Sequence, residues 1–163
     1  MKSNRLATHF HKGAGFCPLV ICPGWQVSQL NDCEALHADT LAAIEKHDDT
    51  DEVFVLVKGE SRLVIAHVPE HGAATFDCVA MEQGITYNVP RSVWHAISTA
   101  PGAQVMIVER DRTHVDGVAR RTLTGGERKA LRALLRAGAS PRPDGREPGK
   151  TDNLEKGGKR CVP

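Results

Sequence analysis

The chain has 163 residues, of which 40% are hydrophobic and 25% charged, and its formal net charge is +1. This composition is typical of one soluble globular domain and excludes a collagen-like or membrane-embedded chain. The apolar run over residues 16–22 is interrupted by Pro18 and is too short to span a membrane, and no signal-peptide pattern precedes it. We therefore expect a cytoplasmic protein with no membrane partner.

Short runs of β-branched and apolar residues, separated by turn formers, follow one another through the first two thirds of the chain. They predict strands over residues 17–22, 25–31, 52–59, 61–68, 75–81, 85–90, 94–99 and 104–110. Because no helical segments alternate with them, we expect an all-β antiparallel sandwich or barrel rather than a parallel sheet.

A short helix is predicted after the strands. Thr124 and Glu127 match a capping box, and Leu131 and Leu135 lie on a narrow apolar stripe between basic residues. We expect one amphipathic helix over about residues 124–138. Its lone basic face without stacking aromatics is typical of a solvated surface helix, so we expect no nucleic-acid partner.

The charge is unevenly distributed along the chain. Residues 120–163 carry 12 Lys and Arg against 5 Asp and Glu, whereas residues 1–119 carry 9 against 15. The stretch after the helix is dense in Pro, Gly and charge with almost nothing to bury, which predicts disorder. We therefore divide the chain into a β-barrel domain over 1–119 and a basic helix with a disordered tail over 120–163.

The segment over residues 45–60 contains the most informative polar residues. Glu52 opens a strongly apolar strand and shares its alternation with Phe54 and Leu56, so its carboxylate is expected to face the interior. His47 stands five residues earlier, an odd separation that would place the two side chains on opposite faces of a regular strand. The intervening DDTD is rich in turn-forming residues, so a turn there can bring both side chains to the same side. A buried carboxylate needs a partner, and an interior cation would supply one.

A second histidine falls on a later strand. His95 follows the turn former Pro90 and shares a strand face with Ile97. Two imidazoles and one carboxylate from separate strands form a facial ligand set that suits Fe, Mn, Zn, Ni or Co and leaves positions open for water or substrate. We predict one divalent metal ion held by His47, Glu52 and His95.

These segments resemble the two signature motifs of the cupin superfamily. The first motif places four residues between a ligand His and a ligand Glu, and six between that Glu and a Gly; here these are His47, Glu52 and Gly59. The second places five residues between a Gly and a Pro, and a ligand His five positions after that Pro; here these are Gly84, Pro90 and His95.

The resemblance covers about residues 25–110 and implies a cupin-type antiparallel β-barrel, or jelly roll. More narrowly, WQVSQLN, HDDTDEVFVLVKG, YNVPRSVWH and VMIVER are similar to small bacterial single-domain cupins of the functionally uncharacterised kind. Paired barrels are common among cupins. The apolar second face of the Glu52 strand, formed by Val53, Val55 and Val57, also needs cover, so we expect a homodimer.

The chain departs from the motifs at three positions. Glu45 stands where the family has its first ligand His, and it could be a second carboxylate ligand or face solvent. Ser92 replaces the usual glycine of the second motif, and Thr99 its terminal asparagine. We expect three ligands and leave Glu45 open.

The resemblance leaves the activity open. A metal-dependent enzyme acting on a small polar metabolite, as isomerase, lyase or dioxygenase, is the leading hypothesis, with Tyr87, Glu45 and His67 as candidate proton-transfer groups if they point inward. The alternative is a cupin that binds or senses a small ligand without turning it over. For Tyr87 and His67, packing with a satisfied polar tip is the competing interpretation.

Overall fold

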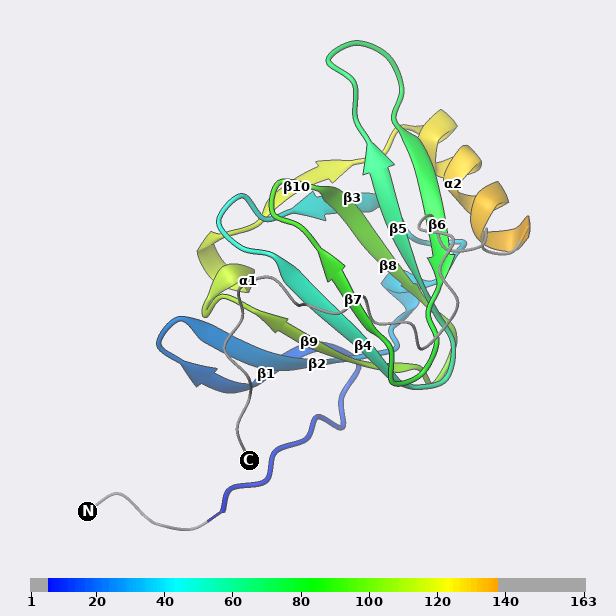
Figure 1. The fold of residues 1–163 in the computed structure, drawn as a ribbon. Coiled ribbons are helices and arrows are strands. Elements are labelled where there is room, and N and C mark those ends of the chain that lie inside the picture. Colours follow the sequence, from blue (N-terminus) through cyan, green and yellow to red (C-terminus); the bar gives the residue numbers. More distant parts are fainter. Residues whose placement is uncertain (1–5, 138–163) are drawn as a thin grey trace, which may run out of the picture.

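The computed structural model describes residues 6–137, which fold into two antiparallel five-stranded sheets packed face to face (Figure 1). The first sheet has the order β1-β2-β9-β4-β7, formed by β1 (Gly15–Cys22), β2 (Trp25–Asn31), β9 (Gln104–Glu109), β4 (Glu52–Lys58) and β7 (Thr86–Val89). The second has the order β10-β3-β8-β5-β6, formed by β10 (Ala119–Thr122), β3 (Ala43–Lys46), β8 (Trp94–Thr99), β5 (Ser61–His67) and β6 (Thr75–Ala80).

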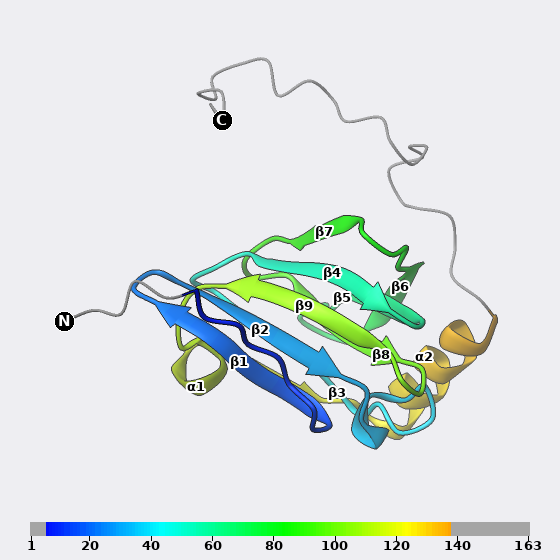
Figure 2. The ribbon, with the colours of Figure 1, turned by 90° about the horizontal axis from the view of Figure 1, so that it is seen from below.

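Three short helical elements accompany the sheets: η1 (Glu34–Leu36), α1 (Thr113–Asp116) and α2 (Gly125–Ala137). Figure 2 shows the first sheet as one layer in front of the second, with α1 and α2 at opposite ends of the molecule. All eight predicted strands are present within one or two residues of their expected ends. The predicted all-β fold of antiparallel strands with a C-terminal helix is confirmed.

The main core lies between the two sheets and follows the alternation of the strands. On β4, Phe54 and Leu56 point inward and are buried, whereas Val57 on the other face is 50% exposed. On β9, Val105 and Ile107 are buried in the same way. One face of each strand therefore supplies the apolar interior, as the period-two pattern predicted.

A second core lies between the second sheet and α2. Leu131 and Leu135 of the helix pack against Val64 and Cys78 of the sheet. The predicted capping box is formed, because the Glu127 carboxylate accepts from the Thr124 amide and the Thr124 hydroxyl lies 3.3 Å from the Glu127 amide. The pKa of Glu127 is lowered to about 2, because Arg121 and the amides of Ala74 and Thr124 hydrogen-bond its charged form.

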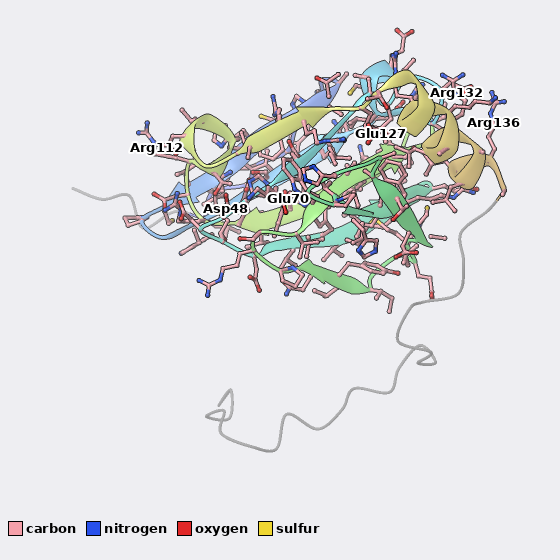
Figure 3. The ribbon with its side chains drawn as sticks, turned by 90° about the horizontal axis from the view of Figure 1, so that it is seen from above. Asp48, Glu70, Arg112, Glu127, Arg132 and Arg136 are labelled. Carbon is pink, nitrogen blue, oxygen red and sulfur yellow. The ribbon has the colours of Figure 1, made fainter. Side chains whose placement is uncertain are left out.

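The exposed side of α2 is basic, as predicted. Arg132 and Arg136 extend from the helix away from the sandwich (Figure 3). Both guanidinium groups form ion pairs with the Asp39 carboxylate, at 3.5 and 2.7 Å. None of the helices among residues 6–137 has the length and apolar character needed to cross a bilayer. The cytoplasmic location stays a prediction.

Two strands were absent from the sequence-based expectation, and both are only four residues long. β3 contains Glu45 and Lys46, and β10 contains Arg120 and Arg121, so neither has the apolar run that identified the others. They pair with each other, and β3 also pairs with β8. The expected division after residue 119 falls inside β10, so the sandwich continues beyond it. The predicted disordered tail lies outside the described residues.

Candidate metal centre

The structure brings His47, Glu52 and His95 together inside the sandwich. His47 directly follows β3, Glu52 begins β4 and His95 lies on β8, so both sheets contribute. The Nε2 atoms of His47 and His95 lie 3.1 and 2.8 Å from the same oxygen, Glu52 Oε2. The three side chains are almost fully buried, with exposed fractions of 4%, 4% and 2%. Their role as metal ligands stays a prediction.

The loop between His47 and Glu52 resets the side-chain direction, as the turn chemistry predicted. Asp51 accepts hydrogen bonds from the Asn88 amide group and the Arg91 backbone, while the Ser92 amide donates to the His47 carbonyl. Ser92 has φ of +64°. A glycine is expected there because the left-handed region strains other residues, so this departure from the motif carries a local cost of about 1 kcal/mol.

Backbone carbonyls orient both imidazoles. His47 Nδ1 lies 3.2 Å from the Gly117 carbonyl oxygen, and His95 Nδ1 lies 2.9 Å from that of Val93. A carbonyl oxygen can only accept, so each Nδ1 carries the proton. In neutral rings this leaves both Nε2 lone pairs directed at the centre. Metal-binding histidines are commonly held in this way.

The hydrogen bonding around the centre is incomplete, which is the observation that tests its fit to a metal. His47 Nε2 is buried and has no hydrogen-bond partner among the described residues, although it lies 3.1 Å from Glu52 Oε2. A buried polar atom without a partner is costly, and metal coordination would satisfy it. The donor set of two imidazoles and a carboxylate therefore fits a divalent transition metal.

The electrostatics of the three groups are strongly linked. Burial opposes the charged form of His47, yet the Glu52 carboxylate prevails and raises the pKa of His47 to about 9. The pKa of His95 is raised for the same reason, again against burial. For Glu52, the two imidazoles outweigh burial and lower the pKa of the carboxyl. The centre thus has a strong preference for positive charge beside Glu52.

Glu45, which the sequence left open, reaches the centre. It pairs with His95 across β3 and β8, and its carboxylate lies within 4.8 Å of nitrogen atoms of His47 and His95. Arg120 Nε on β10 donates to Glu45 Oε2 at 3.2 Å. This geometry allows Glu45 to act either as a further ligand or as a group adjacent to the metal.

Glu109, at the end of β9, is a site residue that the sequence analysis missed. It is 6% exposed, and its carboxylate lies within 4.8 Å of ligand atoms of His47 and Glu52. Gln26 Nε2 donates to Glu109 Oε1 at 2.8 Å and also lies 3.1 Å from His114 Nδ1. Burial, with the nearby charge of Glu52, raises the pKa of Glu109 to about 7. The sequence did contain a clue, because Glu109 stands at alternate positions with the apolar Val105 and Ile107 on one strand. The same alternation identified Glu52 as an inward-facing residue.

The structure does not bring Tyr87 or His67 to the centre. Tyr87 packs against the core on β7, and its hydroxyl accepts a hydrogen bond from the Glu82 amide at 2.9 Å. His67 stands at the exposed end of β5 and pairs with Asp77 at 2.8 Å. Their placement gives no support for the predicted proton-transfer roles.

The candidate ligands line a pocket of about 570 Å³. Glu45, Glu109, His114 and Arg120 line it as well, together with apolar residues of both sheets. The pocket is also bordered by residues of the segment between β2 and β3. Space for a small molecule therefore adjoins the cluster.

Fold and site together define an antiparallel β-sandwich with a candidate His/Glu metal centre. No family model and no curated protein matches the chain. Similar solved structures include a cupin-2 domain containing protein from Shewanella frigidimarina NCIMB 400, with 17% identity and a TM-score of 0.43 over 62% of this chain and 84% of that one.

Two further similar structures are those of KdgF and oxalate decarboxylase. KdgF from Halomonas sp. shares 13% identity, with a TM-score of 0.43 over 60% of this chain and 77% of that one. Oxalate decarboxylase from Bacillus subtilis shares 19% identity, with a TM-score of 0.44 over 69% of this chain and 29% of that one. This chain thus matches less than a third of the decarboxylase. Cupins are among the structures that it is similar to, as the motifs predicted.

Proposed function

We propose that this protein binds one divalent metal ion through His47, Glu52 and His95, and that it is a metal-dependent enzyme acting on a small molecule. The observation that carries the proposal is the convergence of two buried imidazole Nε2 atoms on one oxygen of Glu52, at 3.1 and 2.8 Å, in rings whose Nδ1 atoms are already held by backbone carbonyls. Two imidazoles and a carboxylate that converge in this way form a ligand set for one divalent ion.

The donor set narrows the choice of ion to Fe, Mn, Zn, Ni or Co. The chemistry that such an ion supplies in an open site is Lewis-acid polarisation of a substrate oxygen or activation of dioxygen. The two backbone carbonyls keep the imidazoles in the ligating tautomer, and Glu52 provides the negative charge that favours a cation. Isomerase, lyase and dioxygenase activities all remain compatible with these residues.

Glu109 and Glu45 are the carboxyl groups beside the candidate metal centre that could transfer a proton, which an enzyme needs and a protein that only binds its ligand does not. An enzyme of these classes needs a proton-transfer group within reach of the reacting atoms. Glu109 lines the pocket beside His47, and its pKa of about 7 allows it to hold or release a proton at neutral pH. Glu45 also lines the pocket, although Arg120 pairs with its carboxylate. These contacts favour the enzyme over the non-catalytic binding protein.

Elemental analysis tests the proposed centre. We expect wild-type protein, stripped with a chelator, reloaded separately with Mn²⁺, Fe²⁺, Zn²⁺, Ni²⁺ or Co²⁺ and desalted, to retain about one ion per chain with at least one of these metals. His47→Ala should retain far less, because it removes a buried ligand. His67→Ala is the matched control, since that histidine is exposed and distant from the centre, and it should retain as much metal as wild type. Equal, low metal content in all three proteins would refute the centre.

We further propose that the protein is a homodimer, as expected from the sequence. The outer face of the first sheet carries Val57 and Val108, which are 50% and 38% exposed, beside the half-buried Val53 and Val55. The N-terminal stretch runs over β1 and β2 (Figure 2), where the His11 backbone exchanges hydrogen bonds with the Gln29 side chain. An apolar face of this kind favours association.

Light scattering coupled to size-exclusion chromatography measures the oligomeric state. At micromolar concentration we expect the mass of two chains for the wild type. Val57→Lys should shift the mass toward one chain, because it places a charge in the apolar face. Glu60→Lys, at an exposed residue in the next turn, is the control and should leave the dimer intact. A wild-type mass of one chain would refute the dimer.

A further inference from the structure

The pocket beside the candidate ligands has a polar end and an apolar remainder. On the three strands that supply Glu52, His95 and Glu109, the neighbouring residue on the same face is apolar: Phe54 follows Glu52, Ile97 follows His95 and Ile107 precedes Glu109. All three apolar residues line the pocket. The Phe54 ring meets the His95 ring edge to face at 6.0 Å between centroids. The polarity of the pocket therefore changes within one strand repeat.

The remaining walls are apolar as well. Leu36 and Leu41 come from the segment before β3, and Phe16 comes from β1. Ala43 is exposed and lies on the same face of β3 as Glu45. Among the described residues that line the pocket away from the polar end, Thr40 is the one that carries a side-chain hydroxyl. A ligand with hydroxyl groups along its whole length would lose water without gaining hydrogen bonds from these walls.

The charges at the polar end limit the charge of the ligand. Three carboxylates, those of Glu45, Glu52 and Glu109, lie around the two histidines, and Arg120 is paired with Glu45. Arg120 and one divalent ion would together offset these carboxylates, which leaves little excess positive charge. A small dianion would gain little here, whereas a neutral or singly charged oxygen donor could reach the centre without repulsion.

We infer that the ligand of this pocket is an amphipathic small molecule, with a neutral or monoanionic oxygen-chelating end at the candidate metal centre and an apolar body against Phe54, Ile97, Ile107 and the walls beyond. This specifies the substrate class of the proposed function and rests on it for the chelating end. Relative to the small polar metabolite expected from the sequence, it adds an apolar body, because the apolar walls arise from residues that only the fold brings together.

Alkyl hydroxamic acids test the inference, because they keep one bidentate oxygen head, which binds a metal ion as the monoanionic hydroxamate, while the body changes. Isothermal titration calorimetry of metal-loaded protein would compare acetohydroxamic, butyrohydroxamic and hexanohydroxamic acids. We expect the affinity to rise about fourfold for each added methylene until the pocket is filled. A 6-amino analogue of the longest probe, with a charged end to its body, should lose most of that gain. Equal affinities along the series would overturn the inference while leaving the metal centre in place.

A matched pair of variants locates the effect in the pocket. Ala43 is exposed at the rim of the pocket, and Ala43→Leu adds bulk there, so it should abolish most of the gain with chain length while acetohydroxamic acid still binds. Ala73→Leu makes the same change in an exposed loop and should bind the whole series like wild type. Equal chain-length gains in both variants would place the alkyl body outside this pocket and contradict the proposal.

A metal-free arm separates this inference from the proposed function. In chelator-treated protein, heteronuclear NMR would follow the amide signals of Ala43 and Ile107 during titration with hexan-1-ol and, separately, with hexane-1,2,6-triol. We expect saturable shifts with the alcohol and none with the triol at equal concentration. If no metal binds but these shifts appear, the proposed metal function fails and the apolar preference stands. If neither alcohol shifts these signals, the apolar preference is refuted, whatever the metal content.

Discussion

Glu52→Gln should lower the affinity for the divalent ion by at least about 100-fold, the largest functional effect expected of any conservative substitution in this chain. The carboxylate is the sole anionic group within 3.1 Å of both imidazole Nε2 atoms in the described structure. Glutamine keeps the size of the side chain but removes the charge, and loss of an anionic ligand weakens a metal site more than loss of an orienting partner, which costs 10–100-fold. Competition titration against a chromophoric chelator measures the affinity.

The same substitution should change the titration of His47 in metal-free protein. Burial lowers the pKa of His47, and Glu52 raises it to about 9, so removal of the charge should return the pKa toward 6.5 or below. In the metal-free wild type, the raised pKa contributes stability that is present below about pH 6.5 and lost as the pH rises through about 9. Glu52→Gln should therefore flatten this loss.

NMR titration of the imidazole signals and chemical denaturation between pH 6 and 10 would check both effects. Glu60→Gln removes an exposed carboxylate and is the matched control, which should leave metal affinity and the His47 pKa unchanged. An unchanged pKa in Glu52→Gln would contradict the electrostatic coupling described for the centre. An unchanged metal affinity would exclude Glu52 as a ligand and leave the remaining carboxylates, Glu45 and Glu109, to be tested in the same way.

Gly59→Ala should lower the free energy of unfolding by about 3 kcal/mol, a large effect for the addition of one methyl group. Gly59 ends the first motif at φ of +76°, a conformation that costs other residues roughly 1–2 kcal/mol. The new Cβ would also stand 2.8 Å from Ala103 Cα and 3.1 Å from Ala103 N, so backbone would have to move. Overpacking of this kind costs about a further 1–3 kcal/mol.

Gly84→Ala separates the two contributions. Gly84 belongs to the second motif and has the same φ of +76°, but a Cβ there would meet nothing within 4 Å. We expect a loss of roughly 1 kcal/mol from backbone strain alone. Urea denaturation of the three proteins gives the comparison. Equal losses in the two variants would mean that the contact with Ala103 relaxes at no cost.

The sequence contained enough information to predict the fold class and much of the site. Strands such as Glu52–Lys58 can be predicted from the alternation of their residues, because a residue buried on one face must be apolar or paired. The same rule marked Glu52 as exceptional, and the motif spacing then linked it to His47 and His95. The Asp-rich turn before Glu52 could be interpreted for the same local reason, since short polar side chains satisfy turn backbone.

Tertiary structure decided the features that depend on contacts between distant segments. β3 and β10 are too short and polar to be recognised alone, and they exist because each pairs with a neighbouring strand. Glu109 enters the site because β9 lies between β2 and β4, which sets it beside Gln26 and near Glu52. Tyr87 lies against the core and His67 at an exposed strand end, although both are on predicted strands.

The sequence by itself determined the strands, the inward face of each and the three residues proposed to hold a metal, because burial and turn chemistry act on neighbouring residues. Only the tertiary structure decided which inward faces meet, and so which carboxylates join the histidines and how apolar the pocket beside them is. Those properties depend on strand pairing across more than 80 residues, as between Gln26 and Glu109, and local alternation carries no information on that pairing.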